Sequence, residues 1–392
     1  MANLSRNKGE WSEMYIFLKL LADGRVYAAD KDLHRIPTAF LNILKIIREE
    51  VVSKVYWYVP GTLIKIFLNG VDTHKTCSLE ELTRQKDFLW REINKRHISA
   101  SFTIPSVESF LQTIFVTKPS APSAAKGKQF GGAVDITMET LDYKSGLSNV
   151  VGFSCKSDLS AKSTLFNASG DNTNFVYRVE GAVNDDTMSR FNAIFGRTKK
   201  NGERAIAIGN RIRFLKESGC SLHFEKTSQE TAETNLVMSG GLELPAIIGE
   251  ALRYYYFVNE GKSSACSIED AIDNLVTVNP VGYRKLVKET YRKRLADLLY
   301  NMFTGMKLKS PWDGKRTVNG GYIVVLGDGE VLAYHSCMED EFREFLLSRL
   351  GFDSPSCSRH HYMQMYKEDG LYKLKLNLHV RFINPKSQKQ ET

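Results

Sequence analysis

Apolar residues recur at helical spacing in two stretches near the N-terminus. In the first they are Trp11, Met14, Tyr15, Leu18 and Leu21, and in the second they are Phe40, Leu41, Leu44 and Ile47. Positions three and four residues apart share one face of a helix. The pattern predicts a helix over residues 10–21, ended by Asp23-Gly24, and a second helix that begins at Pro37, a residue suited to a first helical turn.

Three further segments carry local signals. Residues 78–81 (Ser-Leu-Glu-Glu) have the spacing of a capping box and predict a helix that runs towards His97, and residues 105–116 predict a short helix. Residues 56–67 resemble strand sequence interrupted by Pro and Gly. Residues 118–132 are rich in Pro, Lys and small side chains with little to bury, so we expect a mobile loop that orders on a ligand.

Strand and helix signals alternate over the rest of the chain. Strands are predicted at residues 134–141, 150–157, 175–179, 322–326, 331–334 and 372–382, and residues 185–303 are mainly helical in pattern. This order predicts an α/β or α+β fold with a largely helical second lobe. We divide the chain into residues 1–182, with the chemical core, and residues 183–392, with the helical lobe and the C-terminal strands.

Composition narrows the class of protein. The 392 residues carry a net charge of +8, and no apolar run approaches the ~20 residues of a membrane span. The six cysteines lack CxxC pairing and the start lacks an apolar signal segment, so we expect a cytoplasmic protein without a zinc ribbon or disulfide framework. The positive charge favours a polyanionic partner. Its densest run, residues 284–294, is either a solvated helix face or a phosphate-binding one.

The segment over residues 134–157 carries the candidate chemistry. On its first predicted strand Asp135, Thr137 and Glu139 share the polar face, and on its second Ser154 and Lys156 share the polar face with Gly152. A two-residue turn at Ser145-Gly146 places Asp135 directly opposite Lys156 and leaves Asp142 near the turn. A carboxylate beside a lysine suits a magnesium-dependent phosphodiesterase. An ordinary ion pair across the hairpin is the other interpretation.

An acid on one strand followed by Ser-x-Lys on the next resembles the PD-(D/E)XK nuclease superfamily in its Ser-x-Lys variant. Five segments resemble, in order, the HpaII-like restriction endonuclease family. They are NKGEWSEMYIFLKLLADG, GFSCKSDLSAKSTLFNASGDNTNF, GGYIVVLGDGEVLAYH, FDSPSCSRHHY and LYKLKLNLHVRF, between residues 7 and 382. The resemblance implies a PD-(D/E)XK nuclease core with a mixed sheet flanked by helices, and a type II restriction endonuclease of a prokaryotic cytoplasm.

The resemblance also implies roles for residues. Asp135 is then the carboxylate that binds Mg²⁺, Lys156 is the catalytic lysine, and the backbone carbonyl of Cys155 is a metal ligand. Ser154 stands where most superfamily members carry a second acid and cannot supply that charge. Glu13, four residues after Gly9, resembles the helical glutamate of junction-resolvase-like relatives and is the candidate replacement, although a solvated helix-face residue fits the same position.

Two features remain open in the chain's own pattern. Glu139 lies on the same predicted face as Asp135 but nearer the turn, and it ranks below Glu13 as the second acid. The residues before Asp135 are Gly-Gly-Ala-Val, so the name-giving Pro-Asp pair of the superfamily is absent. The assignment of Asp135 therefore depends on hairpin register and resemblance.

Candidate DNA-binding residues lie outside the hairpin. Arg359, His360 and His361 offer donors to guanine edges or phosphates, or are ordinary loop residues. Asn167 and residues 172–174 belong to stretches of short polar side chains that would let the backbone approach DNA closely. Lys126 and Lys128 of the expected loop are candidates for phosphate contacts.

We therefore expect an enzyme that hydrolyses double-stranded DNA at a short site, with CCGG as the candidate implied by resemblance. Palindromic sites favour a homodimer, and a cognate DNA methyltransferase is implied as a functional partner. A structure-selective nuclease such as a junction resolvase, and a catalytically silent DNA-binding protein, are the alternatives.

Overall fold

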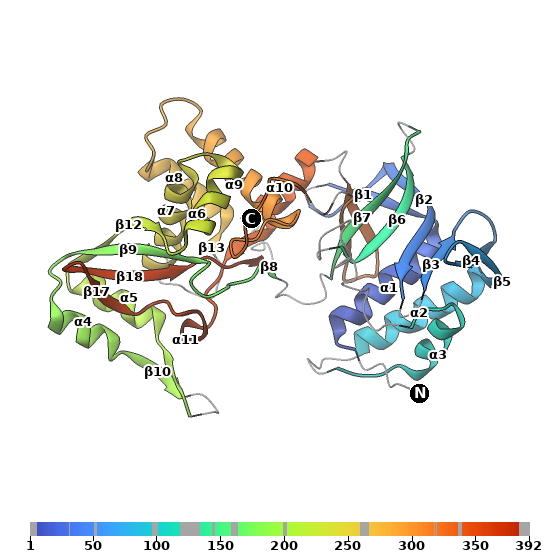
Figure 1. The fold of residues 1–392 in the computed structure, drawn as a ribbon, viewed down its shortest axis with the longest axis horizontal. Coiled ribbons are helices and arrows are strands. Elements are labelled where there is room, and N and C mark those ends of the chain that lie inside the picture. The colour runs from blue at the N-terminus through green and yellow to red at the C-terminus, as the bar shows by residue number, and fades with distance from the viewer. Residues whose placement is uncertain are drawn as a thin grey trace, which may run out of the picture. The chain divides into compact units, whose positions relative to one another are not determined.

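The computed structural model describes residues 6–30, 32–50, 53–95, 101–117, 134–142, 146–157, 164–198, 202–258, 266–316, 318, 320–335 and 339–383 (Figure 1). The chain forms two compact units, residues 1–163 with 316–345 and residues 164–315 with 346–392. The sequence placed the division near residue 182 and all later strands in the second part. In the structure the division is at residues 163–164, and residues 316–345 return to the first unit because two of their strands join its sheet.

Unit 1 is a mixed sheet with helices. Its elements are α1 (Lys8–Asp23), β1 (Arg25–Ala29), β2 (Arg35–Glu49), β3 (Lys54–Tyr58), β4 (Leu63–Leu68), β5 (Val71–Ser78), α2 (Leu79–Lys95), α3 (Pro105–Thr113), β6 (Ile136–Asp142), β7 (Ser148–Ser157), β14 (Gly321–Val325) and β15 (Val331–His335). The strand order is β1-β15-β14-β7-β6-β2-β3-β4-β5, with β7–β14 and β1–β15 parallel. Because β1 also pairs with β2, the strands β1, β15, β14, β7, β6 and β2 form a closed ring of pairings.

Helix α1 is the predicted first helix, and its ends explain its length. Asn7 and Glu10 form a reciprocal capping box at its start, and Gly24 ends it in the left-handed conformation with its N–H bonded to the Leu20 carbonyl. The helix contacts α2 and strands β1, β2 and β7 (Figure 1). Its apolar face, including the fully buried Trp11 and Leu18, therefore belongs to the core of unit 1.

Several other predictions are confirmed. Helices α2 and α3, the interruption between β3 and β4, strands β6 and β7, and the hairpin of β14 and β15 lie where the sequence placed them. The Glu81 N–H donates to Ser78 Oγ over 3.2 Å, as the capping interpretation requires. Among the described residues, no helix combines the length and the apolar character needed to cross a membrane.

The helix predicted from Pro37 is wrong, because residues 35–49 form strand β2. Leu41 and Ile43 are buried on one phase of the strand, and Ile46 is buried on the other. A register shift between Ile43 and Lys45 accounts for the change of phase. Such a bulge adds one residue to a two-residue period, which produces spacings of three that resemble a helix. Pairing with β1, β3 and β6 stabilises the strand.

Unit 2 combines helices with small antiparallel sheets. Its elements are β8 (Thr164–Phe166), β9 (Asn174–Gly181), α4 (Asp185–Asn192), β10 (Phe195–Thr198), β11 (Arg204–Ile206), α5 (Ile208–Glu217), β12 (Cys220–Thr227), α6 (Glu230–Gly240), α7 (Leu244–Arg253), a π-helical turn (Tyr254–Val258), β13 (Cys266–Ser267), α8 (Ile268–Val278), α9 (Val287–Phe303), β16 (Leu350–Phe352), α11 (Cys357–His360), β17 (Met365–Glu368), β18 (Leu371–Asn377) and β19 (Val380–Phe382). Helix α10 (Glu339–Arg349) spans the boundary between the units.

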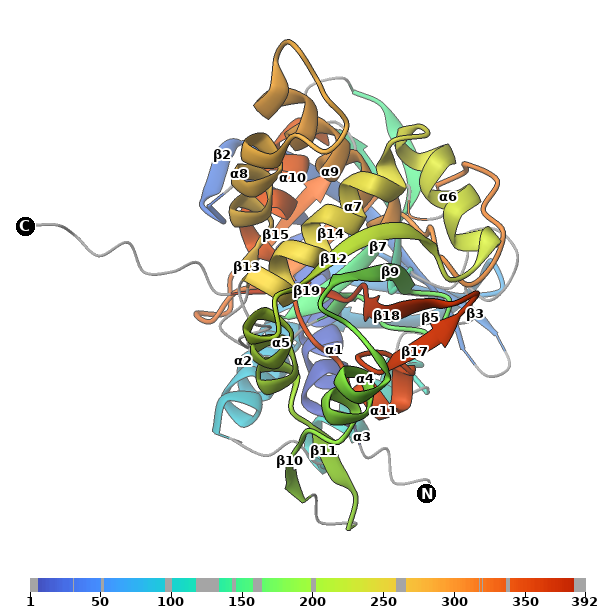
Figure 2. The same ribbon diagram turned by 90° about the vertical axis from the view of Figure 1, so that its left-hand side faces the viewer.

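The sheets of unit 2 have the orders β12-β9-β18-β17 and β13-β16-β19-β8, and β10 pairs with β11 alone. Helix α7 packs on β12 (Figure 2). Phe224 of β12 lies over Gly249 of the helix. The Tyr177 hydroxyl donates to the Gly249 carbonyl over 2.6 Å and ties β9 to the same helix. Residues 185–303, predicted as mainly helical, thus also contain the strands β10 to β13, which the sequence pattern did not predict.

Gly321, at the start of β14 in unit 1, allows a test of how closely β14 and β15 pack. Its φ is +121°, and a Cβ there would lie 1.9 Å from the Tyr334 carbonyl oxygen of β15. Gly61 has a φ of +119°, and a Cβ there would meet no heavy atom within 4 Å. We expect Gly61→Ala to cost about 1–3 kcal/mol for backbone strain, and Gly321→Ala to cost at least about 2 kcal/mol more. Denaturant unfolding of both variants measures the difference, and equal losses would contradict the steric argument.

Candidate active site

The hairpin of β6 and β7 has a register different from the predicted one. Thr137 pairs with Gly152 and Leu141 with Ser148, whereas the two-residue turn required Thr137 opposite Ser154. The Asp142 N–H donates to the Leu147 carbonyl, so the connection between the strands is longer than Ser145-Gly146 alone. The shift is two residues and therefore preserves the face on which each side chain lies. The prediction that Asp135 lies directly opposite Lys156 is wrong.

In this register Asp135 lies beside Ser154 and Cys155. Its Oδ2 accepts a hydrogen bond from the Cys155 N–H over 2.7 Å and one from Ser154 Oγ over 3.1 Å. The Asp135 N–H donates to the Phe153 carbonyl over 2.8 Å, which fixes the residue at the point where β6 begins. Ser154 is 6% exposed, so its hydroxyl orients the carboxylate from a buried position.

The backbone of Cys155 points towards the same carboxylate. In an extended strand the N–H and C=O of one residue face the same neighbouring strand. Because the Cys155 N–H bonds to Asp135, the Cys155 carbonyl faces that side as well. A carboxylate and a carbonyl oxygen therefore lie on the same side of β7, and oxygen ligands of this kind suit Mg²⁺ or Ca²⁺.

Lys156 follows Cys155 on β7, and its backbone pairs with Val324 of β14. Its side chain lies outside the described part of the structure. Gly152, four residues earlier, has a local reason to lack a side chain, because a Cβ there would lie 2.8 Å from Val134 Cγ2. This close approach allows the chain that leads into Asp135 to pass over β7.

Glu13 lies on α1, the helix that contacts β7. Its charge acts on Arg48, which is buried at the end of β2 and bonds through Nε to Glu50 Oε1 over 2.9 Å. Burial lowers the pKa of Arg48, while the negative charges of Glu50 and Glu13 oppose that effect. Ile47 pairs with Thr137, so this end of β2 adjoins the beginning of β6. Glu13 thus acts on Arg48 at the end of β2 that adjoins the beginning of β6, and Asp135 directly precedes β6.

The carboxylate of Glu139 is bound by residues outside the proposed site. It forms an ion pair with Lys45 of β2 and accepts a hydrogen bond from Ser148 Oγ over 3.1 Å. The bond from Lys45 lowers the pKa of Glu139. Its cross-strand neighbour is Val150, which places it two pairs from Gly152 in the direction of the turn.

A separate group of possible metal ligands occurs at Asp30, Asp32 and His34. Asp30 Oδ1 accepts the backbone N–H groups of Asp32 and His34 over 2.9 and 2.8 Å, the pattern of a local Asx turn. Asp32 and His34 are exposed. The turn accounts for the grouping without a metal.

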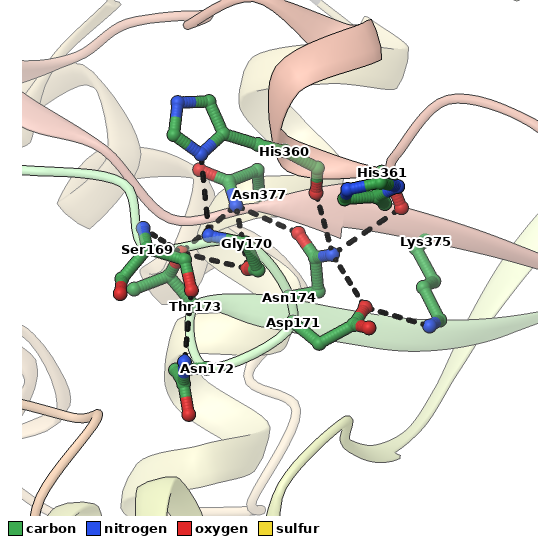
Figure 3. A network of polar contacts seen from close by, with 10 residues as sticks. All are labelled: Ser169, Gly170, Asp171, Asn172, Thr173, Asn174, His360, His361, Lys375 and Asn377. Atoms are coloured by element: carbon green, nitrogen blue, oxygen red, sulfur yellow. Dashed lines mark hydrogen bonds and ion pairs between the residues drawn. The ribbon is translucent and has the colours of Figure 1, made fainter.

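Unit 2 brings together two segments that the sequence singled out separately. Residues 169–174 and the turn at His360-His361 meet in one polar network with Lys375 and Asn377 of β18 (Figure 3). The Asn174 side-chain amide donates to the His360 carbonyl over 2.9 Å and to the His361 carbonyl over 3.3 Å. The network therefore holds the backbone of the turn that carries the two histidines.

Asn174 and Thr173, which were expected to let the backbone approach DNA, have side chains buried inside unit 2. Asn174 is 1% exposed and Thr173 is 1% exposed. The Asn377 amide donates to Asn174 Oδ1 over 2.6 Å and to Thr173 Oγ1 over 2.9 Å, so both side chains are used inside the unit. Buried amides need such partners, because an unmet one costs on the order of 1–3 kcal/mol.

The side chain of His360 has a defined donor. Its Nδ1 accepts the Gly170 N–H over 3.2 Å, so in the neutral ring the proton is on Nε2, which Figure 3 shows turned away from the network. Burial lowers the pKa of His360, and the charges of Arg359 and His361 act in the same direction. The ring is therefore neutral near pH 7 and offers Nε2–H to an acceptor.

The other candidates for DNA contact in unit 2 are accessible. Asn167, Arg359 and His361 are exposed, and His361 ends α11 in the left-handed conformation. Arg359 is adjacent to His360, whereas Asn167 precedes the network by two residues. Lys126 and Lys128 lie outside the described residues, as does the rest of the loop expected at 118–132.

Sequence reasoning missed the residues that support the turn. Asp171, Lys375 and Asn377 carry no motif, although Lys375 Nζ bonds to Asp171 Oδ1 over 2.7 Å and that oxygen also accepts the Asn174 amide. A polar Asn at the end of an otherwise alternating strand was the available signal at position 377.

Comparison with known proteins covers nearly the whole chain. Residues 7–382 match the family described as HpaII restriction endonuclease. The type II restriction enzyme HpaII of Haemophilus parainfluenzae is 29% identical over 380 residues, which are 97% of this chain and 99% of that protein. No solved structure matches. The chain therefore belongs to the HpaII restriction endonuclease family, and its enzyme class is that of the type II site-specific deoxyribonucleases.

Proposed function

We propose that the chain hydrolyses phosphodiester bonds of double-stranded DNA at a short specific site, with Mg²⁺ as cofactor, at the hairpin of β6 and β7. The observation that carries the proposal is the meeting of the Asp135 carboxylate with Ser154 and the backbone of Cys155. This arrangement fits the Ser-x-Lys variant of the PD-(D/E)XK nuclease core, in which the acid and the lysine lie on adjacent strands.

The residues present fit a hard divalent cation. Asp135, the Cys155 carbonyl and Glu13 would hold it, which supplies two negative charges and three oxygen ligands. When bound, the cation supplies Lewis acidity for the scissile phosphate and its attacking water. Ser154 keeps the carboxylate of Asp135 in place by donating to it, and its neutral hydroxyl adds no charge.

Lys156 supplies the positive charge of the site. Lys156 is two residues after Ser154 on β7. Its backbone pairs with Val324 of β14 and directly follows Cys155, whose N–H binds Asp135. Its ammonium orients the attacking water by hydrogen bonding and stabilises negative charge that develops on the phosphate.

The turn at α11 is the proposed element of sequence recognition. Arg359, the Nε2–H of His360, and His361 present donors that match the N7 and O6 acceptors of guanine. A CCGG-type site would offer those acceptors, and a relative of this chain is the type II restriction enzyme HpaII. Asn167 adds a further exposed polar side chain, and Lys126 and Lys128 contact phosphates.

The remaining expectations follow from this activity. A palindromic target favours a homodimer, because two-fold symmetry of the protein then matches that of the site. A cognate DNA methyltransferase would protect the host DNA, and both proteins would work in a prokaryotic cytoplasm.

The direct test is incubation of the purified protein with plasmid DNA and Mg²⁺. We expect discrete fragments with Mg²⁺ and intact plasmid with a chelator, because the phosphate needs the cation's charge. A smear would indicate an unspecific or structure-selective nuclease, and a shifted but uncut plasmid would indicate a silent DNA-binding protein. Both results contradict the proposal. Fragments that end at CCGG would support the finer assignment.

The role of Asp135 is tested by Asp135→Asn. The amide oxygen can still accept from the Cys155 N–H, so the fold should be kept with only a small fall in melting temperature while the negative charge is lost. We expect cleavage to fall by on the order of 10³-fold or more, with DNA binding retained, and Lys156→Ala to have a similar effect. Cleavage rate and a binding assay without metal separate the two properties.

Asp142→Asn is the matched control, since Asp142 lies on the same strand near the connection. It should cut at close to the wild-type rate. An inactive Asp142→Asn together with an active Asp135→Asn would move the metal site to the other end of β6.

The second acid is tested by comparing Glu13→Gln with Glu139→Gln. Glu13→Gln should reduce cleavage on the order of 10²-fold and raise the Mg²⁺ concentration needed for half-maximal rate, because a charged ligand is lost. Glu139→Gln removes a partner of Lys45 and should leave the Mg²⁺ requirement unchanged. Titration of the rate with Mg²⁺ decides between them, and the reverse result would place the second acid on the hairpin.

A further inference from the structure

Strands β10 and β11 form a two-stranded ribbon in unit 2 without further strands beside it. Gly196, Arg197 and Thr198 of β10 are exposed, as is Arg204 of β11. Figures 1 and 2 show the ribbon extending from the body of the unit. Residues 199–201, which join the strands, lie outside the described part of the chain. A ribbon of this size is marginal in water by itself, so its base must hold it.

The base of the ribbon is fixed by the buried side chain of Arg211 from α5. Its guanidinium donates to the carbonyls of Ile194, Asn192 and Met363. Asn192 adds a reciprocal pair of bonds with the backbone of Met365, over 2.8 and 3.0 Å. These contacts join the start of β10 to the segment that follows α11.

The ribbon therefore adjoins the proposed recognition turn. Strand β11 contacts α11, the helix that carries Arg359 and His360. Arg211 reaches both the residue before β10 and Met363, two residues after His361. Ribbon and turn belong to one framework, so a DNA duplex on the turn has the ribbon as its immediate neighbour.

The two arginines of the ribbon are not ion-paired with the acids that the structure describes, Glu203 beside Arg204 included. Arg197 and Arg204 have no carboxylate partner among the described residues. Arg204 lies over the Phe195 ring at 4.8 Å, and Arg211 lies 5.4 Å from the same ring. Two guanidinium groups thus share one ring, which concentrates positive charge at the base of the ribbon.

The cations of α9, in contrast, are paired with carboxylates. Lys288, Lys293 and Arg294 lie 3.0, 2.8 and 3.7 Å from Asp273, Asp297 and Glu243, and Arg292 pairs with Glu269. For the α9 part of residues 284–294, the paired helix face therefore fits these contacts, whereas Arg284 and Lys285 precede the helix and are exposed. Arg197 and Arg204 are cations of the ribbon that adjoins the recognition turn, and neither has a carboxylate partner among the described residues.

We propose that the β10–β11 ribbon is an arm that binds the phosphate backbone of duplex DNA through Arg197 and Arg204. This deepens the proposed function and rests on it. The ribbon has the dimensions of elements that lie along a DNA groove, both arginines are exposed, and each neutralised phosphate releases counterions. The arm contributes to binding of any duplex sequence, whereas the turn at α11 distinguishes sequences.

The test is the double variant Arg197→Gln/Arg204→Gln, which keeps the aliphatic stem over Phe195. Affinity is measured against salt concentration on a duplex with the target site and on a random duplex. Two lost phosphate contacts should lower the slope of log affinity against log salt by about 1.8, so that between ~50 and ~200 mM salt the wild type loses about tenfold more affinity than the variant. Both duplexes should be affected equally, with an unchanged melting temperature.

Lys288→Gln/Lys293→Gln is the control, since it removes the same charge from the same unit and should leave the slope unchanged. An unchanged slope in the ribbon variant, or an equal change in the control, overturns the arm. Loss confined to the target duplex also overturns it, because the ribbon would then read bases. If the wild type cuts DNA while the slope is unchanged, the arm alone has failed. If the wild type neither binds nor cuts DNA, the proposed function has failed as well.

Discussion

The candidate active site depends on the hydrogen bond from the Cys155 N–H to the carboxylate of Asp135. The ladder between β6 and β7 has its last pair at Ile136 and Phe153, so beyond it the Cys155 N–H has no β6 carbonyl to meet. Cys155 is buried, and an unmet buried N–H is costly. The Asp135 side chain takes the place of the missing carbonyl, and a bond to an ionised acceptor is stronger than one between neutral groups. Folding thereby brings a negative charge to the backbone of β7 before any ligand is present.

This arrangement lets one carboxylate serve both structure and chemistry. The bonds from Cys155 and Ser154 both go to Oδ2. A carboxylate has about four acceptor positions on its two oxygens, so these two bonds do not exhaust its capacity. The contrast with Glu139 is informative: that carboxylate is occupied by Lys45 and Ser148 on the sheet surface. Both residues are acids. Asp135 differs from Glu139 in its position at the end of the β6–β7 ladder, and this position makes it the proposed ligand.

The sequence predicted those elements whose period is uninterrupted and failed where a local irregularity changed the period. Helix α1 and strands β6 and β7 follow simple spacings and were found. In β2 the bulge near Leu44 shifts the alternation and mimics a helix. In the hairpin, face alternation gave the correct polar face, but register depends on the length of the connection, which a Ser-Gly pair does not determine. Asn174 is buried by contacts with residues 360, 361 and 377, which are distant in sequence. The local sequence pattern therefore could not distinguish it from an exposed polar residue.

The framework of unit 2 holds main-chain atoms rather than the side chains that would read DNA. Asn174 bonds to the carbonyls of His360 and His361, and Arg211 bonds to that of Met363. A carbonyl is present whatever side chain the residue carries. Substitution at positions 359–361 can therefore change the donors offered to a base pair while the turn keeps its conformation. The chain also passes between its two units only at residues 163–164, 315–316 and 345–346, so the residues that hold the turn and those that surround Asp135 belong to separate cores. Substitutions in the turn can for this reason change recognition without altering the hairpin that is proposed to hydrolyse the phosphodiester bond.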